Sequence, residues 1–142
     1  MLDKNGYDIY DGDGFTFQWS CENGHLHIAQ WLFSLGNIDI HDCNDYAFRY
    51  SCANGHLNVV QWLLSLGVDV HDDNDRAFQL SCENGHLDVA QLLCSLFSID
   101  ISANNHYPLQ MSCKNNHFDV AQLLCALYHR YSIKVAIEFT VN

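Results

Sequence analysis

One segment recurs four times along this chain of 142 residues, and no other feature restricts the fold as strongly. The copies begin at Phe15, Tyr46, Arg76 and Tyr107. A Ser-Cys pair inside them recurs at an almost constant interval, with its cysteine at Cys21, Cys52, Cys82 and Cys113. A period of this length is typical of stacked supersecondary units, because one such unit cannot bury its apolar face alone. The sequence therefore predicts a solenoid.

Each copy contains two helical patterns with a turn between them. In the second copy Phe48, Ser51 and Cys52 fall at i, i+3 and i+4, which predicts a first helix near residues 47–53. Apolar residues then continue at helical spacing over residues 57–66, which predicts a second helix. The composition agrees with a packed domain of this kind, since 49% of the residues are hydrophobic and 13% are aromatic.

The second-helix signature of the ankyrin repeat matches the stretch from Gly55 to Leu63, Gly-His-Leu-Asn-Val-Val-Gln-Trp-Leu. The tail motif of that family matches Gly67 to His71. Its opening Thr-Pro-Leu-His motif survives best as Tyr107 to Gln110 and more loosely as Tyr46 to Arg49. The chain thus resembles the ankyrin-repeat family over about Gly6 to Tyr128, and the fourfold recurrence in register makes the resemblance specific.

The resemblance implies an all-α fold, an ankyrin-repeat solenoid of about four stacked helix-turn-helix units. Short, hairpin-like segments, which we call fingers, connect the second helix of one unit to the first helix of the next. The fingers are expected to be short because the interval between successive Ser-Cys pairs falls below the family period of about 33 residues. This Ala-Phe-x-x-Ser-Cys variant is similar to the short-finger ankyrin arrays of giant DNA viruses. The family function implied is protein–protein interaction without catalysis.

The repeat register predicts the boundaries of the units. The expected segments are a partial finger of a truncated preceding repeat at 1–14, repeats at 15–45, 46–75 and 76–106, an incomplete fourth repeat at 107–128, and a diverged tail at 129–142. The first segment is interpreted as a finger because residues 6–15 align position for position with residues 67–76. In the tail, residues 131–141 carry apolar side chains at every second position, which predicts a strand that caps the stack or stays free.

Glycine and asparagine positions lead to two predictions about the backbone. The residues after the first-helix turn should have positive φ, since glycine and then asparagine best tolerate the left-handed region. They are Gly24, Gly55, Gly85 and Asn116. The second helices should stop at Gly36 and Gly67, whereas Phe97 and Tyr128 in the same column predict different exits for the third and fourth units.

The recurring cysteines and histidines do not predict a metal site. Zinc ligands must converge to within 2.0–2.3 Å of one point, but equivalent residues on stacked helices lie about 8–10 Å apart. Cysteine in such columns is interpreted as a small core residue, and the histidines as polar braces between successive turns. The cysteines expected in the core are Cys21, Cys52, Cys82, Cys113, Cys94 and Cys125, and the brace histidines are His25, His56, His86 and His117.

Other chemical sites find little support in the sequence. Cys43 is expected to be an exposed thiol between carboxylates, which blunt its reactivity. Residues 11–14, Asp-Gly-Asp-Gly, resemble the start of a calcium loop but lack its later ligands. We found no nucleophile-elbow, P-loop or metalloprotease motif, so we expect no catalytic residues, no cofactor, no metal and no small-molecule substrate.

The net charge of −11 argues against nucleic acid and anionic membranes as partners, because both require clustered Lys and Arg. Without a signal peptide or an apolar run of membrane-spanning length, and with an odd number of cysteines, the chain is expected in the reducing cytoplasm. A viral origin would place it in the cytoplasm of the host.

Twelve of the seventeen acidic residues lie in or beside the predicted fingers, next to aromatic residues of the first helices. Such a mixture favours a protein interface, and we expect a partner with a basic surface or segment. The predicted contact residues are Trp19, Asp42, Asn44, Asp45, Tyr46, Arg49, Tyr50, Asp72, Asp73, Asp75, Arg76, Gln79, Asn105, Tyr107 and Gln110. Trp31 and Trp62, which share one helical column, are expected in the core. The alternative is a structural remnant of a longer array with no partner of its own.

Overall fold

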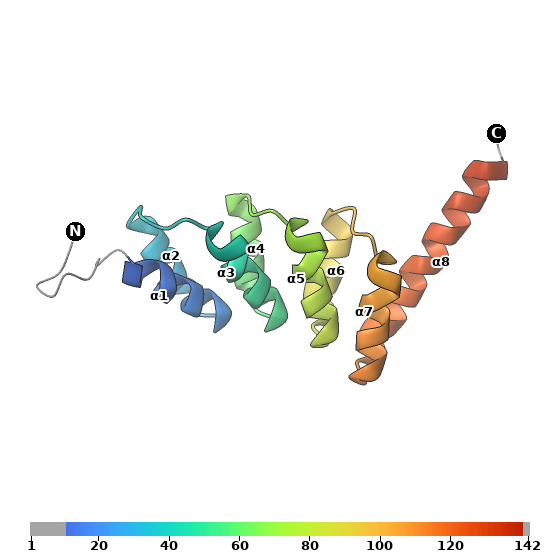
Figure 1. Cartoon of the computed structure of the whole chain (residues 1–142), viewed down its shortest axis with the longest axis horizontal. Coiled ribbons are helices and arrows are strands. Elements are labelled where there is room, and N and C mark those ends of the chain that lie inside the picture. Colours follow the sequence, from blue (N-terminus) through green and yellow to red (C-terminus); the bar gives the residue numbers. More distant parts are fainter. Residues whose placement is uncertain (1–10, 141–142) are drawn as a thin grey trace, which may run out of the picture.

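The computed structural model contains eight helices within residues 11–140, the part of the chain that the structure describes, and side chains are described for residues 12–132. The helices form four antiparallel pairs (Figure 1). Their bounds are α1 Asp11–Glu22, α2 Leu26–Ser34, α3 Asp42–Ala53, α4 Leu57–Leu66, α5 Asp72–Glu83, α6 Leu87–Leu96, α7 Ala103–Lys114 and α8 Phe118–Thr140. We call the pairs units 1 to 4.

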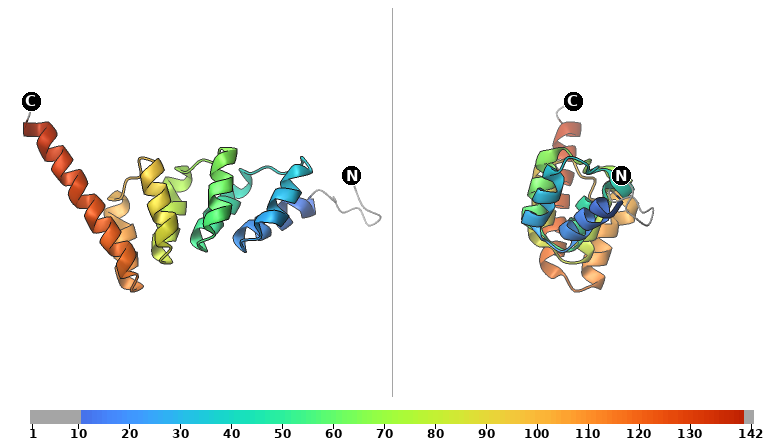
Figure 2. Two further views of the ribbon diagram at one scale, coloured as in Figure 1. Left: turned by 180° about the vertical axis from the view of Figure 1, so that it is seen from behind. Right: turned by 90° about the vertical axis from the view of Figure 1, so that its left-hand side faces the viewer.

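The four units stand in a row, and each contacts the next along the chain. Helices α1, α3, α5 and α7 form one layer and α2, α4, α6 and α8 the other, as the view from behind and the end-on view show (Figure 2). The described residues contain helices but no strand. The predicted all-α solenoid of about four helix-turn-helix units is confirmed.

Small and apolar side chains from both helices of each unit form the core between units. Phe48, Cys52 and Leu63 in unit 2 are completely buried. Ser51 is buried as well, and its hydroxyl donates to the carbonyl of Ala47 at 2.6 Å and to that of Cys21 in the preceding unit at 3.1 Å. Small residues at these positions let neighbouring helices approach closely, and the backbone carbonyls satisfy the buried hydroxyl.

The turn inside each unit is a Schellman motif with a left-handed residue. In unit 2 the Gly55 amide donates to the Cys52 carbonyl at 3.2 Å and the His56 amide to that of Ser51 at 2.9 Å. Gly55 has φ +73°, a conformation that side chains with a Cβ disfavour. The predicted positive φ is confirmed at all four turns, with +76° at Gly24, +80° at Gly85 and +64° at Asn116.

Polar side chains tie each turn to the turn of the preceding unit. The Nε2–H of His86 donates to the Ala53 carbonyl at 2.9 Å, and the side-chain amide of Asn84 donates to the same carbonyl at 2.8 Å. Asn54 and Asn115 make the same bond to the carbonyls of Glu22 and Glu83. The predicted brace is confirmed at His86, and it stays a prediction at His25, His56 and His117.

The first helices of units 2 to 4 start with a left-handed turn, which lies inside the bounds of α3, α5 and α7 and ends the preceding finger. In unit 3, Asp73, Asn74 and Asp75 have φ of +50°, +58° and +60°, and residues 43–45 and 104–106 repeat this geometry. The side-chain amide of Gln79 donates to the Asn74 carbonyl at 2.8 Å and so caps the turn. In unit 1 the equivalent residues, Gly12, Asp13 and Gly14, do not have positive φ, although α1 begins at Asp11, the residue equivalent to Asp42 and Asp72.

The exits of the second helices differ as the sequence predicts. Gly67 ends α4 with φ +90°, whereas Phe97 ends α6 in an extended conformation with φ −130° and ψ 152°.

Helix α8 passes Tyr128 without stopping and continues to Thr140. The predicted strand over residues 131–141 is therefore wrong. No left-handed residue stops α8, and its backbone satisfies its own hydrogen bonds where a lone strand would need a neighbour. The proposed finger residues 1–10 lie outside the described part of the chain.

Three residues predicted in the core are exposed at the ends of the stack. Trp31 is 61% exposed, although Trp62 in the same column is partly buried against Phe17 and Phe33. Cys113 and Cys125 are exposed as well. The prediction was wrong at these positions because a neighbouring unit, rather than the unit itself, covers each column, and units 1 and 4 each have one neighbouring unit among the described residues.

Candidate functional site

An aromatic pair with a carboxylate lies between α1 and α3. Tyr46 and Tyr50 stand one helical turn apart on α3, so their rings stack with centroids 4.2 Å apart and planes inclined by 24°. The Tyr46 hydroxyl reaches across to α1 and donates to Glu22 Oε2 at 3.1 Å. Partial burial and this hydrogen bond raise the pKa of the Tyr46 hydroxyl. We call Glu22, Tyr46 and Tyr50 the aromatic patch.

Two features extend the aromatic patch along the first-helix layer. Trp19, on α1, is 47% exposed, and its indole lies 5.3 Å from the imidazole of His25 between ring centroids. Between α5 and α7 the hydroxyl of Tyr107 donates to Glu83 Oε2 at 3.2 Å, which repeats the link between Tyr46 and Glu22. The two glutamates were not among the predicted contact residues. Each precedes its tyrosine by the same interval in the sequence, and that shared column is the signal that could have identified them.

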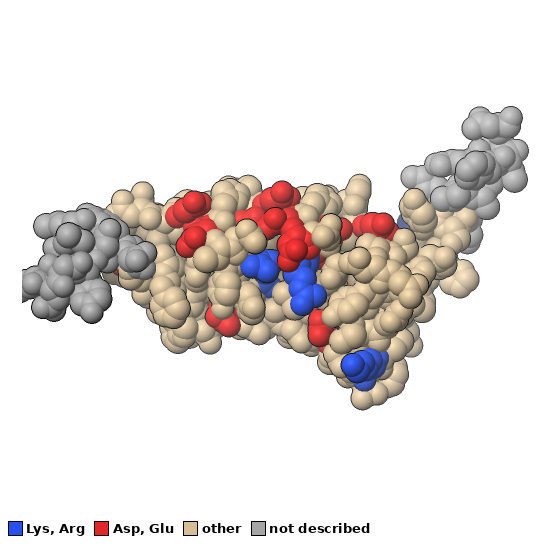
Figure 3. Space-filling view, in the orientation of Figure 1, with Lys and Arg blue, Asp and Glu red and all other residues tan. Residues whose placement is uncertain are grey.

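Carboxylates form a second surface along the finger turns. Asp and Glu side chains gather on the edge above α3 and α5 (Figure 3). Asp42 and Asp73 are exposed and Asp72 is partly exposed. The side-chain amide of Gln18 donates to Asp42 Oδ2 at 3.1 Å. We call Asp42, Asp72 and Asp73 the acidic edge.

Several predicted contact residues stabilise the finger turns. Arg49 donates through Nε to the Asn44 carbonyl at 2.8 Å and through Nη2 to the Cys43 carbonyl at 2.9 Å. Its Nη1 lies 3.8 Å from Asp73 Oδ2. The side-chain amide of Gln110 caps the turn of unit 4 at the Asn105 carbonyl, 2.7 Å away. Arg49 therefore links the finger turn of unit 2 to Asp73 of the acidic edge.

Two predicted contact residues are buried. Asp45 is 3% exposed and accepts a hydrogen bond from His41 Nδ1 at 2.7 Å, while Gln79 is 6% exposed. Asp75 pairs in the same way with His71, at 2.6 Å. Burial removes Asp45 and Gln79 from any contact surface. The remaining predicted residues are partly or fully exposed and lie along the first helices and finger turns, namely Trp19, Asp42, Asn44, Tyr46, Arg49, Tyr50, Asp72, Asp73, Asp75, Arg76, Asn105, Tyr107 and Gln110.

The left-handed finger turns give some of the Asn and Asp residues a structural role as well. Asn and Asp tolerate positive φ better than other residues that carry a Cβ. The Asn and Asp at 44–45, 73–75 and 104–105 therefore satisfy a backbone requirement. Sequence reasoning interpreted the same residues only as surface charge and polarity.

The cysteines of the inner column are packed as core residues rather than as reactive thiols. Burial raises the pKa of the Cys82 thiol to about 12, and it raises the pKa of Cys21 and of Cys52 as well. Cys43 is exposed, as predicted. Within the described residues, no group of three or more His, Cys, Asp or Glu side chains is placed to hold a metal ion.

Two family models match the sequence. A model described as ankyrin repeats (3 copies) covers residues 48–136, and one described as ankyrin repeats (many copies) covers residues 17–64. The first match alone spans more than half of the chain. A search of the curated proteins finds no match. Among the helices that the structure describes, none combines the length and the apolar character that crossing a bilayer requires.

Proposed function

Because the chain belongs to the ankyrin-repeat family, whose members are generally non-enzymatic modules for protein–protein interaction, we propose that it binds a protein partner through its first-helix layer. The partner's contact surface would be the aromatic patch together with the acidic edge.

The observation that carries the proposal is the aromatic patch. Two stacked tyrosine rings held by a carboxylate from the neighbouring helix form a preorganised surface, so little side-chain entropy is lost when a partner docks. Tyrosine is among the residues that contribute most to binding when a partner covers it. The hydrogen bond to Glu22 also fixes the orientation of the Tyr46 ring.

The acidic edge indicates the chemistry of the partner. The chain carries a net charge of −11, and Asp and Glu side chains gather on one edge above α3 and α5 (Figure 3). In the acidic edge, Asp42 and Asp73 are exposed and Asp72 is partly exposed. A partner segment rich in Lys or Arg would be steered to this edge. Rim charges act chiefly on the association rate, whereas buried aromatic contacts act on the dissociation rate.

The test begins with capture of proteins from the native cell on immobilised chain, followed by mass spectrometry and binding kinetics with each purified candidate. Asp72→Asn with Asp73→Asn should lower the association rate by about tenfold at low salt. Tyr46→Ala should mainly raise the dissociation rate, and Tyr46→Phe should retain more of the affinity because it keeps the ring.

The matched control places the same charge change on the other layer. Asp88 and Asp119 are exposed on α6 and α8, so Asp88→Asn with Asp119→Asn should leave the association rate close to the wild-type value. A candidate whose association rate is the same across salt concentrations and in both double variants would contradict the proposal. In that case the acidic edge only keeps the chain soluble, and the alternative of a structural remnant is favoured.

A further inference from the structure

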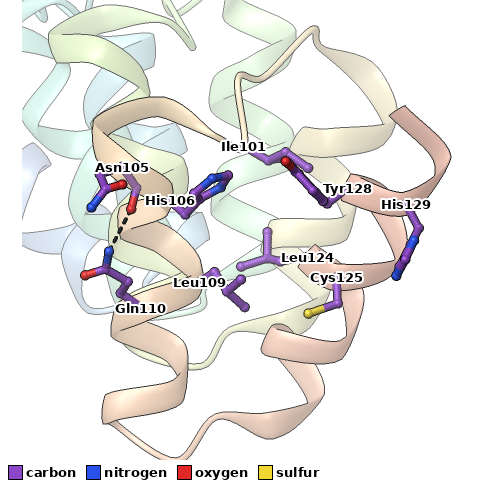
Figure 4. A pocket seen from close by; sticks show the side chains of 9 residues that line it. All are labelled: Ile101, Asn105, His106, Leu109, Gln110, Leu124, Cys125, Tyr128 and His129. Atoms are coloured by element: carbon purple, nitrogen blue, oxygen red, sulfur yellow. Dashed lines mark hydrogen bonds between the residues drawn. The ribbon is translucent and has the colours of Figure 1, made fainter. Parts of the chain in front are cut away.

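A groove opens between α7 and α8 on the face of unit 4 that points away from unit 3. It has a volume of about 370 Å³, and apolar side chains from both helices line it (Figure 4). We call it the end slot. Its principal walls are Leu109, Leu124, Cys125 and Tyr128.

The inner units show what such a groove holds. In unit 1 the residues equivalent to Leu109 and Cys125 are Phe17 and Phe33, one on each helix. The indole of Trp62, from unit 2, packs edge-on against both rings, with centroid distances of 6.1 Å to Phe17 and 5.8 Å to Phe33. The slot of unit 1 is therefore filled by a tryptophan of the following unit.

The opposite end of the chain presents the matching side chain. Trp31 holds the position in unit 1 that Trp62 holds in unit 2, and it is 61% exposed. Ile28, beside it on α2, is also exposed, although Val59 in its column is fully buried. The outer face of unit 1 thus presents apolar side chains equivalent to those that unit 2 packs against unit 1. Among the described residues, no unit covers this face.

We propose that two copies of this chain associate head to tail, with Trp31 of one copy inserted into the end slot of the other. The contact would continue the interface that already joins successive units within the chain. Leucine and cysteine at the slot walls take up less space than the two phenylalanines of unit 1, which leaves room for an indole. Helix α8 leans away from α7 toward its C-terminal end (Figure 1).

Asn116 of unit 4 weakens this contact, and its replacement should change the affinity. In units 1 to 3 the turn glycine lies under the histidine of the next unit, so closely that a Cβ at Gly55 would stand 2.3 Å from His86 Nδ1. Unit 4 has Asn116 at this position. His25 of a second copy must therefore turn aside, which weakens the association. Replacing Asn116 by glycine removes this obstacle and should tighten the contact.

The dependence on salt concentration distinguishes this self-association from the proposed binding of a basic partner, which uses a different surface. Two copies that each carry a net charge of −11 repel one another at low ionic strength. Screening of that repulsion should strengthen self-association as salt rises. Binding of a basic segment to the acidic edge should weaken over the same range.

Sedimentation velocity of the full chain over a concentration series tests the proposal. The wild-type chain should form larger species as its concentration approaches about 1 mM, the scale of a weak complex, and should do so more readily in about 0.5 M than in about 0.05 M NaCl. Trp31→Gln and Cys125→Trp, which fills the slot with an indole from its own chain, should each remain monomeric. Asn116→Gly should shift the association to at least several-fold lower concentration.

Mixing the two monomeric variants provides the decisive control. Trp31→Gln retains the slot and Cys125→Trp retains the free tryptophan, so the mixture should form a one-to-one complex that grows no further. This result also shows that both variants are folded. Leu96→Gln, which removes an exposed apolar side chain from α6 in the middle of the row, should associate like the wild type.

Three results would overturn the proposal. The first is a wild-type chain that stays monomeric at about 1 mM. The second is association that persists unchanged in Trp31→Gln. The third is a mixture of the two variants that contains only monomers although the wild-type chain associates.

Discussion

The inner units and the end units carry almost the same residues in different surroundings. Cys52 in unit 2 is completely buried, whereas Cys113, in the same column of unit 4, is exposed. Val59 is fully buried in unit 2, but Ile28 in unit 1 is exposed. The difference shows that a residue in this array is buried by the neighbouring unit, because each unit is too thin to bury both of its faces.

Truncation of a buried aromatic ring should produce the largest effect. Phe48→Ala in unit 2 removes a completely buried side chain and should lower the free energy of unfolding by about 3–5 kcal/mol. Leu109→Ala, in the same column of unit 4, should cost about 1 kcal/mol because that side chain is partly exposed. Chemical denaturation of both variants checks the comparison. Equal losses would show that the ends are packed as well as the middle.

Gly55 and Gly67 both have positive φ, but only Gly55 lies against a neighbouring side chain. Substitution of each one therefore distinguishes backbone strain from steric crowding. Gly55→Ala should lower the free energy of unfolding by about 2 kcal/mol or more, since the new Cβ has an unfavourable φ and meets His86. Gly67→Ala meets nothing within 4 Å and should cost only the strain, about 1 kcal/mol. Thermal or urea unfolding measures both. A larger loss in the free energy of unfolding for Gly67→Ala than for Gly55→Ala would contradict this prediction.

The buried thiols should lower the free energy of unfolding at alkaline pH. Burial raises the pKa of Cys82 from 9.0 to about 12. The folded state therefore keeps this proton while the unfolded chain releases it above pH 9, and stability falls as pH rises. The loss should be on the order of 1 kcal/mol for each buried thiol at pH 10.

Urea unfolding at pH 8 and pH 10 detects that change, and Cys82→Ala serves as the control because it should reduce the pH dependence. Alkylation of the native protein adds a site-specific comparison. Cys113 and Cys125 should react rapidly, whereas Cys21, Cys52 and Cys82 should be protected. Rapid labelling of Cys52 would contradict the distinction between inner and end units.

Surface charge should contribute least to stability. Asp73 is exposed, and its carboxylate lies 3.8 Å from Arg49 Nη1. Asp73→Asn should change the free energy of unfolding by less than about 0.5 kcal/mol, as is typical of exposed pairs. Denaturation at low and high salt measures the effect, and a loss several times larger would place Asp73 in the structural core of the finger turn.

The periodic features of the fold could be predicted because every unit repeats them. Gly55 with its matched turn residues predicted four left-handed turns, and the column of Phe48, Ser51 and Cys52 predicted the first helices. What could not be predicted depends on contacts between units. Nothing in the residue type distinguishes Trp31 from Trp62. Within the described residues, Trp62 packs against a preceding unit and is partly buried, whereas Trp31 has no such unit beside it and is exposed.

The contact surface was only partly predictable for a related reason. Tyr46 and Tyr50 are one turn apart on a helix, so their exposure on one face follows from the sequence. Asp45 and Gln79 were misjudged because the left-handed turns fold their polar groups inward. Alternation of apolar residues over 131–141 indicated a strand, yet no neighbouring strand is available among the described residues and α8 simply continues.

Native-state hydrogen exchange tests the central claim most directly, because it reports the opening free energy of each helix separately. We expect the amides of α3 to α6, which have a unit on either side, to be the most protected, and those of α1, α2 and α7 to exchange faster. Within unit 4 exchange should be faster than in unit 2 at equivalent amides. Protection in unit 4 that equals or exceeds that of unit 2 would contradict the account.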